Sequence, residues 1–238
     1  MQGDTLTITG SEVNHIRNVL RMKTGDEISV SNGQDEREYR YGIERMEEDA
    51  VYLRLRFIKE DKVELPVKVY LFQGLPKSDK MDLIVQKAVE LGVYAVIPVR
   101  TDRSVLKLDE GKAAKKTARW QSIAEAAAMQ SRRKVSPRVF EPMSMKEAVR
   151  FAVENTDRRC IPYELQEDPS GTGKLLESLR EGESLSVFIG PEGGFEPKEI
   201  ALAQENGIEP ISLGRRILRT ETAGMAFLAW LVYILEIR

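Results

Sequence analysis

The chain has 238 residues, 42% of them hydrophobic, and its 36 Lys and Arg against 38 Asp and Glu give a net charge of −2. This length is enough for one large or two ordinary domains with a sizeable core, and the near-neutral charge argues against a globally basic nucleic-acid-binding protein. The single cysteine, Cys160, excludes an internal disulfide, and the single histidine, His15, leaves no His/Cys cluster with metal-ligand spacing, so we expect no metal site.

Nothing in the sequence indicates export or membrane insertion. Residues 1–10 lack the basic stretch and apolar run of a secretory signal. The longest apolar run, residues 223–235, is shorter than the roughly 20 residues of a membrane-spanning helix. We therefore expect a soluble protein of the reducing cytoplasm.

Short strand-like segments dominate the first 65 residues. The expected strands are 6–8, 27–31, 39–43 and 51–57, with turns at 32–33 and 48–49. One helix interrupts them, with Ser11 as its expected N-cap and with Val13, Ile16 and Leu20 on one face. These patterns predict a small β-rich domain over residues 1–66.

After Leu65-Pro66 the pattern changes to strands that alternate with helices. The expected strands are 67–72, 95–99, 158–162, 186–189 and 210–213. The expected helices are 79–91, 112–131, 145–155, 174–179 and 197–206, followed by a last helix from about residue 222. This alternation predicts an α/β domain with a parallel sheet over residues 67–238.

The last helix is apolar on nearly every side between Ala223 and Leu235. A helix without a polar face must be buried on more than one side. Two arrangements satisfy this requirement: burial within its own domain, or a contact with a second subunit that makes the protein a dimer.

Glycines and arginines gather where two of the expected strands end. The first stretch, Gly190-Pro191-Glu192-Gly193-Gly194-Phe195, follows strand 186–189, and the second, Leu213 to Ala223, follows strand 210–213. In α/β sheets this edge binds ligands. Three glycines beside a proline let backbone N–H and C=O groups approach a nucleoside closely, but they also suit an ordinary strand-to-helix connection.

The second stretch also has two interpretations. Arg215, Arg216 and Arg219 are placed to bind phosphate or to stabilise negative charge on a substrate. Equally, the stretch suits a solvated helix start in which Thr220 caps the helix and Glu221 favours its dipole.

A basic segment, residues 100–138, carries eleven Lys or Arg against four Asp or Glu. Its cations are residues 100, 103, 107, 112, 115, 116, 119, 132, 133, 134 and 138. An extended polyanion such as RNA is one partner that this local charge would fit.

Several familiar motifs are absent. Residues 171–174 (Gly-Thr-Gly-Lys) are similar to the end of a phosphate-binding P-loop, but Asp168 replaces its first glycine and Leu175 its Ser/Thr, so we expect a loop leading into a helix. No G-x-G-x-x-G follows the first strand of the α/β domain, which argues against a dinucleotide-binding fold. Cys160 lies in an expected strand, and we interpret it as a buried structural thiol rather than a reactive one.

Taken together, the two glycine- and arginine-bearing stretches resemble the signature of the RsmE family, SPOUT-superfamily methyltransferases that methylate N3 of a uridine in 16S ribosomal RNA. Further segments that resemble this family are 15–21 (His-Ile-x-x-Val-Leu-Arg), 77–82 (Lys-x-Asp-Lys-Met-Asp), 87–93 (Lys-Ala-x-Glu-Leu-Gly-Val) and 120–133 (Trp120 to Arg133). The resemblance covers nearly the whole chain.

The resemblance implies an N-terminal PUA-like β-barrel that binds RNA and a C-terminal SPOUT domain tied in a deep trefoil knot. It also implies a homodimer, with the last helix at the dimer contact, and S-adenosyl-L-methionine held by the loops of the knot. By motif match, the cofactor-binding residues would be Pro162, Gly190, Pro191, Glu192, Gly193, Gly194, Leu213, Gly214, Ile217 and Leu218.

For catalysis we expect Arg219, Glu221 and Thr222, because they adjoin the proposed cofactor loop; a purely structural role of Glu221 at the start of the last helix stays open. Uridine N3 must lose its proton before it can attack a methyl group. We expect Arg219 to stabilise the charge that develops on the uracil oxygens, with Glu221 orienting Arg219 or helping to remove the proton. For contact with 16S ribosomal RNA or the small ribosomal subunit, the expected residues are His15, Arg17, Arg21, Lys77, Lys80, Arg132 and Arg133.

Two alternatives stay open from the sequence. A related SPOUT enzyme acting on another RNA or another base would hold the cofactor in a similar way. A non-catalytic RNA-binding protein with a degenerate cofactor fold is the second, although glycines at 190, 193, 194 and 214 argue against degeneration.

Overall fold

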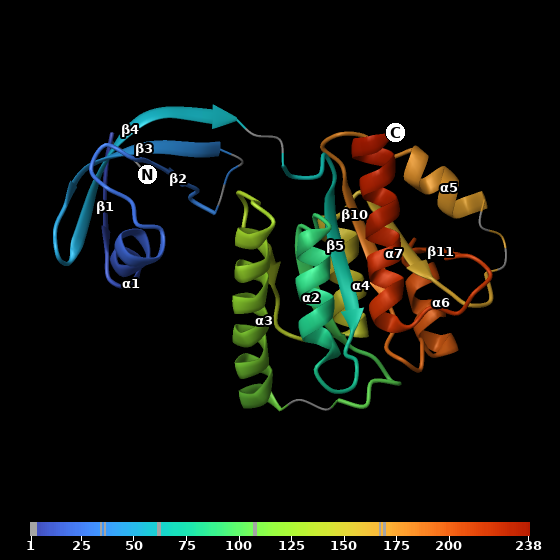
Figure 1. The fold of residues 1–238 in the computed structure, drawn as a ribbon. Helices are drawn as coiled ribbons and strands as arrows, with labels where there is room; N and C mark the ends of the chain where they lie inside the picture. Colours follow the sequence, from blue (N-terminus) through green and yellow to red (C-terminus); the bar gives the residue numbers. More distant parts are fainter. Residues whose placement is uncertain are drawn as a thin grey trace. The chain divides into compact units, whose positions relative to one another are not determined.

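The computed structural model describes residues 4–33, 35, 37–60, 63–106, 109–166, 168 and 170–238. The chain forms two compact units (Figure 1). Unit 1 comprises residues 1–64 together with 132–136, and unit 2 comprises residues 65–131 and 137–238. The observed boundary follows residue 64, two residues before the expected one after residue 66. No sequence pattern predicted that residues 132–136 belong to unit 1.

Unit 1 is built on a four-stranded antiparallel sheet with the order β1-β4-β3-β2. Its strands are β1 (Thr5–Thr9), β2 (Glu27–Val30), β3 (Arg37–Met46) and β4 (Ala50–Glu60). All four expected strands are present, and β3 and β4 are longer than the sequence pattern predicted. Closure of this sheet into a barrel stays a prediction.

The helix of unit 1 differs from the expected one. A short α1 (Ser11–Asn14) continues into a π-helical turn, η1 (His15–Val19), and Gly10 rather than Ser11 occupies the N-cap position. Val13 and Ile16 are buried as expected, in a core with residues of β3 and β4. Leu20 is 51% exposed, because the wider π turn moves it off the buried face.

Segment 132–136 is held in unit 1 by a backbone bridge and by two ion pairs. Val135 forms a parallel bridge with Gly33. The Arg133 side chain, 4% exposed, donates from Nε to Glu64 Oε2 at 3.0 Å, and Lys134 Nζ lies 3.5 Å from Glu38 Oε2. Both acids belong to the N-terminal part of the unit, so these two ion pairs attach residues 132–136 to it.

Unit 2 contains a parallel seven-stranded sheet, as the alternation of strands and helices predicted. Its order is β11-β9-β10-β5-β6-β7, with β8 pairing on the far end of β6. The strands are β5 (Lys68–Gly74), β6 (Ala95–Arg100), β7 (Arg138–Val139), β8 (Met143–Ser144), β9 (Arg158–Pro162), β10 (Ser184–Ile189) and β11 (Glu209–Ile211). Only β7 and β8, of two residues each, were not expected, because so short a strand has no readable period.

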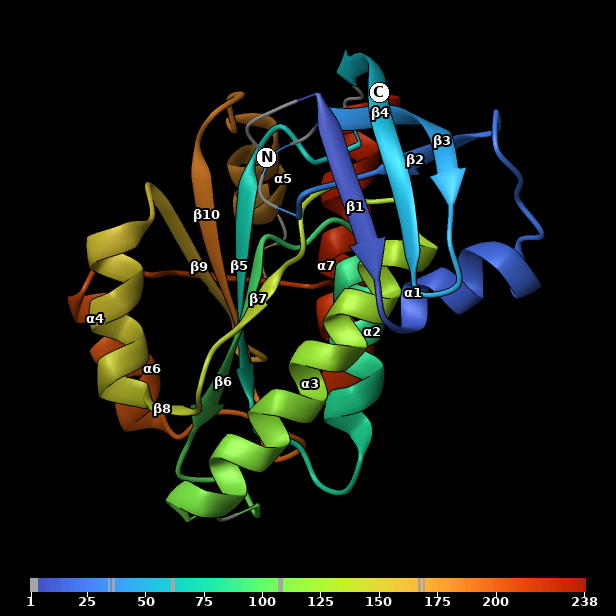
Figure 2. The same ribbon diagram turned by 90° about the vertical axis from the view of Figure 1, so that its left-hand side faces the viewer.

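Helices cover both faces of this sheet (Figure 2). They are α2 (Lys80–Glu90), α3 (Glu110–Gln130), α4 (Met145–Asn155), α5 (Ser170–Glu177), α6 (Pro197–Glu205) and α7 (Thr220–Val232), the last continuing as η2 (Tyr233–Ile237). Residues 171–174 lie inside α5, which corrects the expectation of a loop. The Asp168 carboxylate accepts the Ser170 N–H at 2.8 Å and so starts this helix early.

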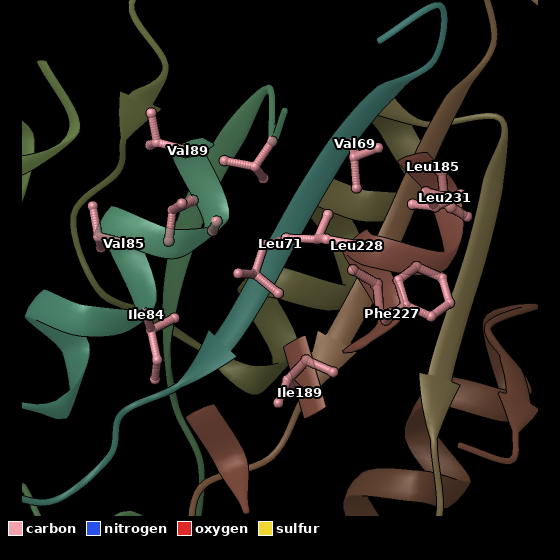
Figure 3. Close-up of a cluster of buried hydrophobic side chains, with 14 of the residues drawn as sticks. Val69, Leu71, Ile84, Val85, Val89, Leu185, Ile189, Phe227, Leu228 and Leu231 are labelled. Atoms are coloured by element: carbon pink, nitrogen blue, oxygen red, sulfur yellow. The ribbon is translucent and has the colours of Figure 1, made fainter. Parts of the chain in front are cut away.

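The largest core cluster lies between the sheet and helices α2, α3, α5 and α7. Figure 3 shows its centre, where Leu71 of β5 and Ile189 of β10 lie with Phe227 and Leu228 of α7. The opposite face of the sheet packs on α4 and α6, with the rings of Phe72 and Phe188 stacked at 4.3 Å. Cys160 is fully buried in the first cluster, and burial raises the pKa of its thiol, as expected for a structural cysteine.

Helix α7 has one buried and one exposed side. Phe227, Leu228 and Leu231 are completely buried, whereas Trp230, Tyr233 and Ile237 are 36%, 55% and 69% exposed. With η2 the helix runs over 18 residues, Thr220–Ile237, long and apolar enough to cross a membrane. That is weak evidence for a membrane span, because a core helix has the same composition and α7 packs in the core of unit 2.

Candidate functional site

Three neighbouring parallel strands of unit 2 end at the same level. Ile211 and Pro162, the last residues of β11 and β9, pair with each other, and Val187 of β10 pairs with Cys160 of β9, two residues before each of these strands ends. The loops that follow β9, β10 and β11 therefore leave one edge of the sheet together. This carboxyl edge is where α/β sheets bind ligands.

These loops enclose a cavity of about 540 Å³. Its walls come from residues 162–164, 189–192, 194–195 and 212–220, with Lys80 and Ala223 completing the lining. The volume falls in the range of roughly 300–1,000 Å³ that is typical of small-molecule sites. The expected joining of the glycine- and arginine-bearing stretches into one site is thus what the structure shows.

Nine of the ten expected cofactor-binding residues line this cavity. They are Pro162, Gly190, Pro191, Glu192, Gly194, Leu213, Gly214, Ile217 and Leu218. The tenth, Gly193, does not line it; its carbonyl accepts a hydrogen bond from Arg103 Nη1 at 2.7 Å.

Glycine is required in the wall of the cavity for steric reasons. A Cβ on Gly74, the last residue of β5, would lie 2.6 Å from Pro191 Cδ, so the loop after β10 packs directly on this glycine. A Cβ on Gly190 would lie 3.1 Å from Gly194 Cα. Gly194 and Gly214 have φ values of +68° and +97°, which other residues adopt only with strain. The backbone can therefore fold tightly around a ligand here.

A buried hydroxyl ties the first turn of α7 to the loop after β10. Thr220 is 4% exposed, and its Oγ1 donates to the Gly190 carbonyl at 2.6 Å and accepts from Gln73 Nε2 at 2.8 Å. Gln73 Nε2 also donates to the Gly74 carbonyl at 3.0 Å. The only signal of this arrangement in the sequence is a glutamine at the end of an otherwise apolar strand.

A second buried threonine fixes the loop after β11. Thr172 Oγ1, in α5, donates to the Ser212 carbonyl at 2.7 Å, and the Ser212 N–H donates back to Thr172 Oγ1 at 3.2 Å. Ser212 Oγ then accepts the Gly214 N–H at 3.2 Å. Thr172 therefore serves the candidate site through hydrogen bonds, although it belongs to no P-loop.

Lys80, at the start of α2, joins two carboxylates at the edge of the cavity. Its Nζ lies 3.1 Å from Glu192 Oε1 and 3.2 Å from Glu221 Oε2, and these hydrogen bonds raise the pKa of Lys80. Although burial opposes it, hydrogen bonds from backbone N–H groups and Lys80 lower the pKa of Glu192. The pKa of Glu221 is lowered first by the hydrogen bond from its own N–H and then by Lys80. Both carboxylates are ionised at neutral pH.

The three expected catalytic residues differ in their placement. Arg219 lines the cavity and is exposed; its carbonyl accepts the Ala223 N–H at 2.8 Å, whereas its guanidinium has no hydrogen bond or ion pair to the described residues. Glu221, with a side chain 16% exposed, does not line the cavity but pairs with Lys80. Thr222 is exposed and lies outside the lining, whereas Thr220, one half-turn earlier, lines the cavity; a catalytic role of Thr222 stays a prediction.

Three of the expected RNA contacts are engaged with other groups of this chain. Arg133 is buried against Glu64, so its guanidinium is not presented to solvent. Lys80 lies at the cavity rather than on an open surface. Arg17 is exposed, but its Nη1 already donates to the carbonyls of Glu47 and Glu48 at 3.1 and 3.3 Å, in the β3–β4 turn.

The remaining four expected RNA contacts, His15, Arg21, Lys77 and Arg132, are exposed. Within the basic segment, most of the excess charge is compensated. Ion pairs hold Arg103, Lys112, Lys116, Arg119, Arg133 and Lys134. Five of their six acidic partners lie outside residues 100–138, which is why counting charges along the sequence overestimated the patch. Lys107 lies outside the described residues.

Two family models cover the chain. Residues 8–56 match an RNA methyltransferase PUA domain and residues 63–232 match an RNA methyltransferase domain. The ribosomal RNA small subunit methyltransferase E of Bacillus subtilis is 40% identical over 99% of this chain and 93% of its own length. The chain belongs to this methyltransferase family. The protein of the same name from Synechocystis is 32% identical over 98% of this chain and 74% of its own length.

Solved structures of this methyltransferase family have the same fold. The methyltransferase E of Neisseria gonorrhoeae, bound to S-adenosyl methionine, is 29% identical and has a TM-score of 0.81 over 98% of this chain and 93% of its own. A Legionella pneumophila protein in complex with the same cofactor is 33% identical, with a TM-score of 0.79 over 97% and 92% of the two chains. The expected fold class, an α/β domain with a parallel sheet behind an N-terminal PUA-like domain, is confirmed.

Proposed function

We propose that this protein transfers a methyl group from S-adenosyl-L-methionine to N3 of a uridine in the 16S RNA of the small ribosomal subunit. The observation that carries the proposal is the cavity at the ends of β9, β10 and β11, lined by nine of the residues that the motifs assigned to the cofactor. Relatives that share the fold over more than 90% of the chain hold this cofactor.

The residues of the cavity fit a cofactor of this kind. Pro162, Phe195 and Leu218 offer apolar surface for a flat base, and the tight turn at Gly190 and Gly194 exposes backbone groups for hydrogen bonds. Glu192, ionised at the wall, favours a positively charged ligand. When bound, S-adenosyl-L-methionine supplies a methyl group on a positively charged sulfur.

Arg219 is the group that we assign to the uracil ring. Loss of the N3 proton leaves negative charge on the carbonyl oxygens at positions 2 and 4 of the base, and a cation beside them stabilises that charge. Arg219 lines the cavity and has no ion pair with a described residue, so its guanidinium is available for this role.

Glu221 acts as an orienting group rather than as the proton acceptor. A lowered pKa makes a carboxylate a weaker base, and Glu221 does not line the cavity in which the uracil base would lie. Its charge attracts both Lys80 and Arg219 toward the mouth of the cavity. Glu221 thereby sets the position of the cation that faces the base.

The decisive experiment is methylation of small ribosomal subunits taken from a strain that lacks the enzyme, followed by mass mapping of the modified nucleoside. N3-methyluridine is the expected product, and another nucleoside would contradict the substrate assignment. Arg219→Ala should lower the single-turnover rate by about 10²- to 10³-fold while cofactor binding by calorimetry stays unchanged. An unchanged rate would remove Arg219 from catalysis, and absent cofactor binding by the wild type would favour a non-catalytic RNA-binding protein.

For the RNA we propose contacts through His15, Arg21, Lys77 and Arg132, which are exposed, and through Arg17 as far as its bonds to the β3–β4 turn allow. Phosphate contacts by arginine and lysine make affinity fall steeply with salt. Residues 1–66, completed by residues 132–136, would form the PUA-like RNA-binding barrel, and the rest of residues 67–238 the SPOUT methyltransferase domain. A cytoplasmic location follows from this substrate.

We also propose that the protein is a homodimer and that its cofactor loops lie in a trefoil knot. The exposed apolar side of α7 and η2, with Trp230, Tyr233 and Ile237, supports the dimer. The hydrogen bonds from Thr172 of α5 to Ser212 and from Thr220 of α7 to Gly190 hold the loops after β11 and β10 to segments distant in the chain, which supports the knot. Light scattering of the wild type and of Tyr233→Asp tests the dimer, and a wild-type monomer at micromolar concentration would contradict it.

A further inference from the structure

Arg103 grips the cofactor loop from the side that faces away from the cavity. It lies in the segment after β6, and its Nε donates to Glu196 Oε1 at 2.8 Å while Nη1 donates to the Gly193 carbonyl at 2.7 Å. A Cβ on Gly193 would lie 3.2 Å from Arg103 Cβ and 3.3 Å from Arg103 Cδ. The aliphatic part of Arg103 therefore packs on Gly193, and its guanidinium binds Gly193 and Glu196, one before and one after Phe195 in the chain.

The residue before Arg103 extends this grip to the start of α6. The Asp102 N–H donates to Glu199 Oε1 at 3.0 Å, and Glu199 Oε2 accepts the Glu196 N–H at 2.8 Å. Glu199 is 5% exposed, so its two hydrogen bonds form a buried attachment. The ion pair of Lys198 Nζ with Asp102 Oδ2 at 2.7 Å lies outside this attachment, because its side chains are 76% and 47% exposed to solvent.

Other contacts of the described residues hold the first half of the loop: Pro191 packs on Gly74, and Glu192 accepts the Lys77 N–H at 3.2 Å and pairs with Lys80 at 3.1 Å. Thr220 holds Gly190 at its beginning, and within the loop the Gly194 N–H donates to the Pro191 carbonyl at 2.9 Å. Three of the residues from 190 to 194 are glycines, which lose the most conformational freedom when they are ordered. The orientation of the peptides after Glu192 thus depends on this one bond within the loop and on the two hydrogen bonds from Arg103.

We propose that Arg103 is a positioning residue for the cofactor, acting through Gly193 and Glu196 to hold the wall of the cavity in its binding shape. The inference rests on the proposed function, which names the ligand as S-adenosyl-L-methionine. Gly190, Pro191, Glu192 and Gly194 line the cavity on the other side of this loop. A loop that is ordered before the ligand arrives spares the ordering cost at binding, so loss of Arg103 weakens cofactor affinity rather than the chemical step.

Calorimetric titration of the full chain with S-adenosyl-L-methionine tests this directly. Arg103→Ala should raise the Kd about tenfold, the equivalent of one charge-assisted hydrogen bond, and the KM for the cofactor should rise while kcat changes little. The Kd of Arg103→Lys should lie between those of the wild type and Arg103→Ala, because an ammonium group reaches one acceptor but does not reproduce both hydrogen bonds of the guanidinium. Lys198→Ala, which removes a neighbouring ion pair without touching residues 190–195, is the matched control and should stay within about twofold.

A readout without cofactor separates this inference from the proposed function. Amides of residues 193–195 should exchange hydrogen faster in ligand-free Arg103→Ala than in the wild type or Lys198→Ala. Equal Kd and equal exchange in Arg103→Ala and wild type would overturn the inference. If the wild type binds no cofactor, the proposed function fails, and the exchange rates alone decide whether Arg103 holds the loop. If Arg103→Ala folds poorly, Arg103→Gln keeps the stem on Gly193 and replaces it in both measurements.

Discussion

Thr220→Val tests how much the buried hydroxyl between α7 and the cofactor loop stabilises unit 2. Valine keeps the shape of threonine but removes the hydrogen bonds to Gly190 and from Gln73, at 2.6 and 2.8 Å. Each neutral hydrogen bond contributes about 1 kcal/mol net, and a buried group left unpaired costs about 1–3 kcal/mol. We therefore expect the free energy of unfolding to fall by about 2–4 kcal/mol.

Urea unfolding followed by tryptophan fluorescence measures this change, because the chain's two tryptophans, Trp120 and Trp230, both lie in unit 2. The midpoint should fall by about 1–2 M. Thr222→Val is the matched control: the same change on the same helix, at an exposed position, should alter the free energy of unfolding by no more than about 0.5 kcal/mol. Equal midpoints for the Thr220 and Thr222 variants would refute the reasoning.

A second substitution sharpens the result. In Thr220→Val the Gln73 side chain loses the hydroxyl to which its Nε2 donates. Gln73→Leu removes this donor as well. In the double variant both partners are apolar, and its loss of stability should be smaller than the sum of the two single losses. Simple additivity would mean that Gln73 and Thr220 do not act together.

Three further outcomes are expected. Lys80→Met removes one cause of the lowered pKa of Glu221, so this carboxylate should lose its charge at a higher pH than in the wild type. The acid limb of the pH–rate profile should therefore move to higher pH. An unmoved limb would exclude Glu221 from the reaction. Glu64→Gln should weaken the pairing with the buried Arg133, lower the stability of unit 1 by about 1–3 kcal/mol and so speed hydrogen exchange in β3 and β4. Glu60→Gln is the control and should have no effect, because the Glu60 side chain is 81% exposed. Arg132→Ala should flatten the slope of log affinity for RNA against log salt by about 0.7–0.9, and Arg132→Lys should not; equal slopes for all three proteins would remove Arg132 from the interface.

Most of the fold could be predicted because the period of the hydrophobic pattern is local. Strands such as β9 and β10 and helices such as α4 lie within two residues of their expected bounds. The failures are equally physical: β7 and β8 are too short to show a period, and the π turn after Asn14 changes which side Leu20 takes. The return of residues 132–136 to unit 1 depends on ion pairs with distant acids, which no local pattern contains.

The candidate site divides in the same way. Residues of the cavity wall could be named because they stand in two short motifs at strand ends. The groups that hold these motifs could not be, since Gln73 is 147 residues from Thr220, Arg103 is 90 residues from Gly193, and Thr172 is 40 residues from Ser212. Lys80 was assigned to RNA because a lysine in a matched motif does not show which acids it will meet in the fold.

The attachment of residues 132–136 to unit 1 has a consequence for the order in which the protein can be made. When residue 64 leaves the ribosome, Glu64 and Glu38 have been synthesised but Arg133 and Lys134 have not. Neither acid can pair with its cation until about 70 more residues have been added, which takes roughly 4–14 s at about 5–20 residues per second. Unit 1 is therefore completed only after β5, α2, β6 and α3 have been translated, and a gene fragment that ends at residue 64 encodes an incomplete domain.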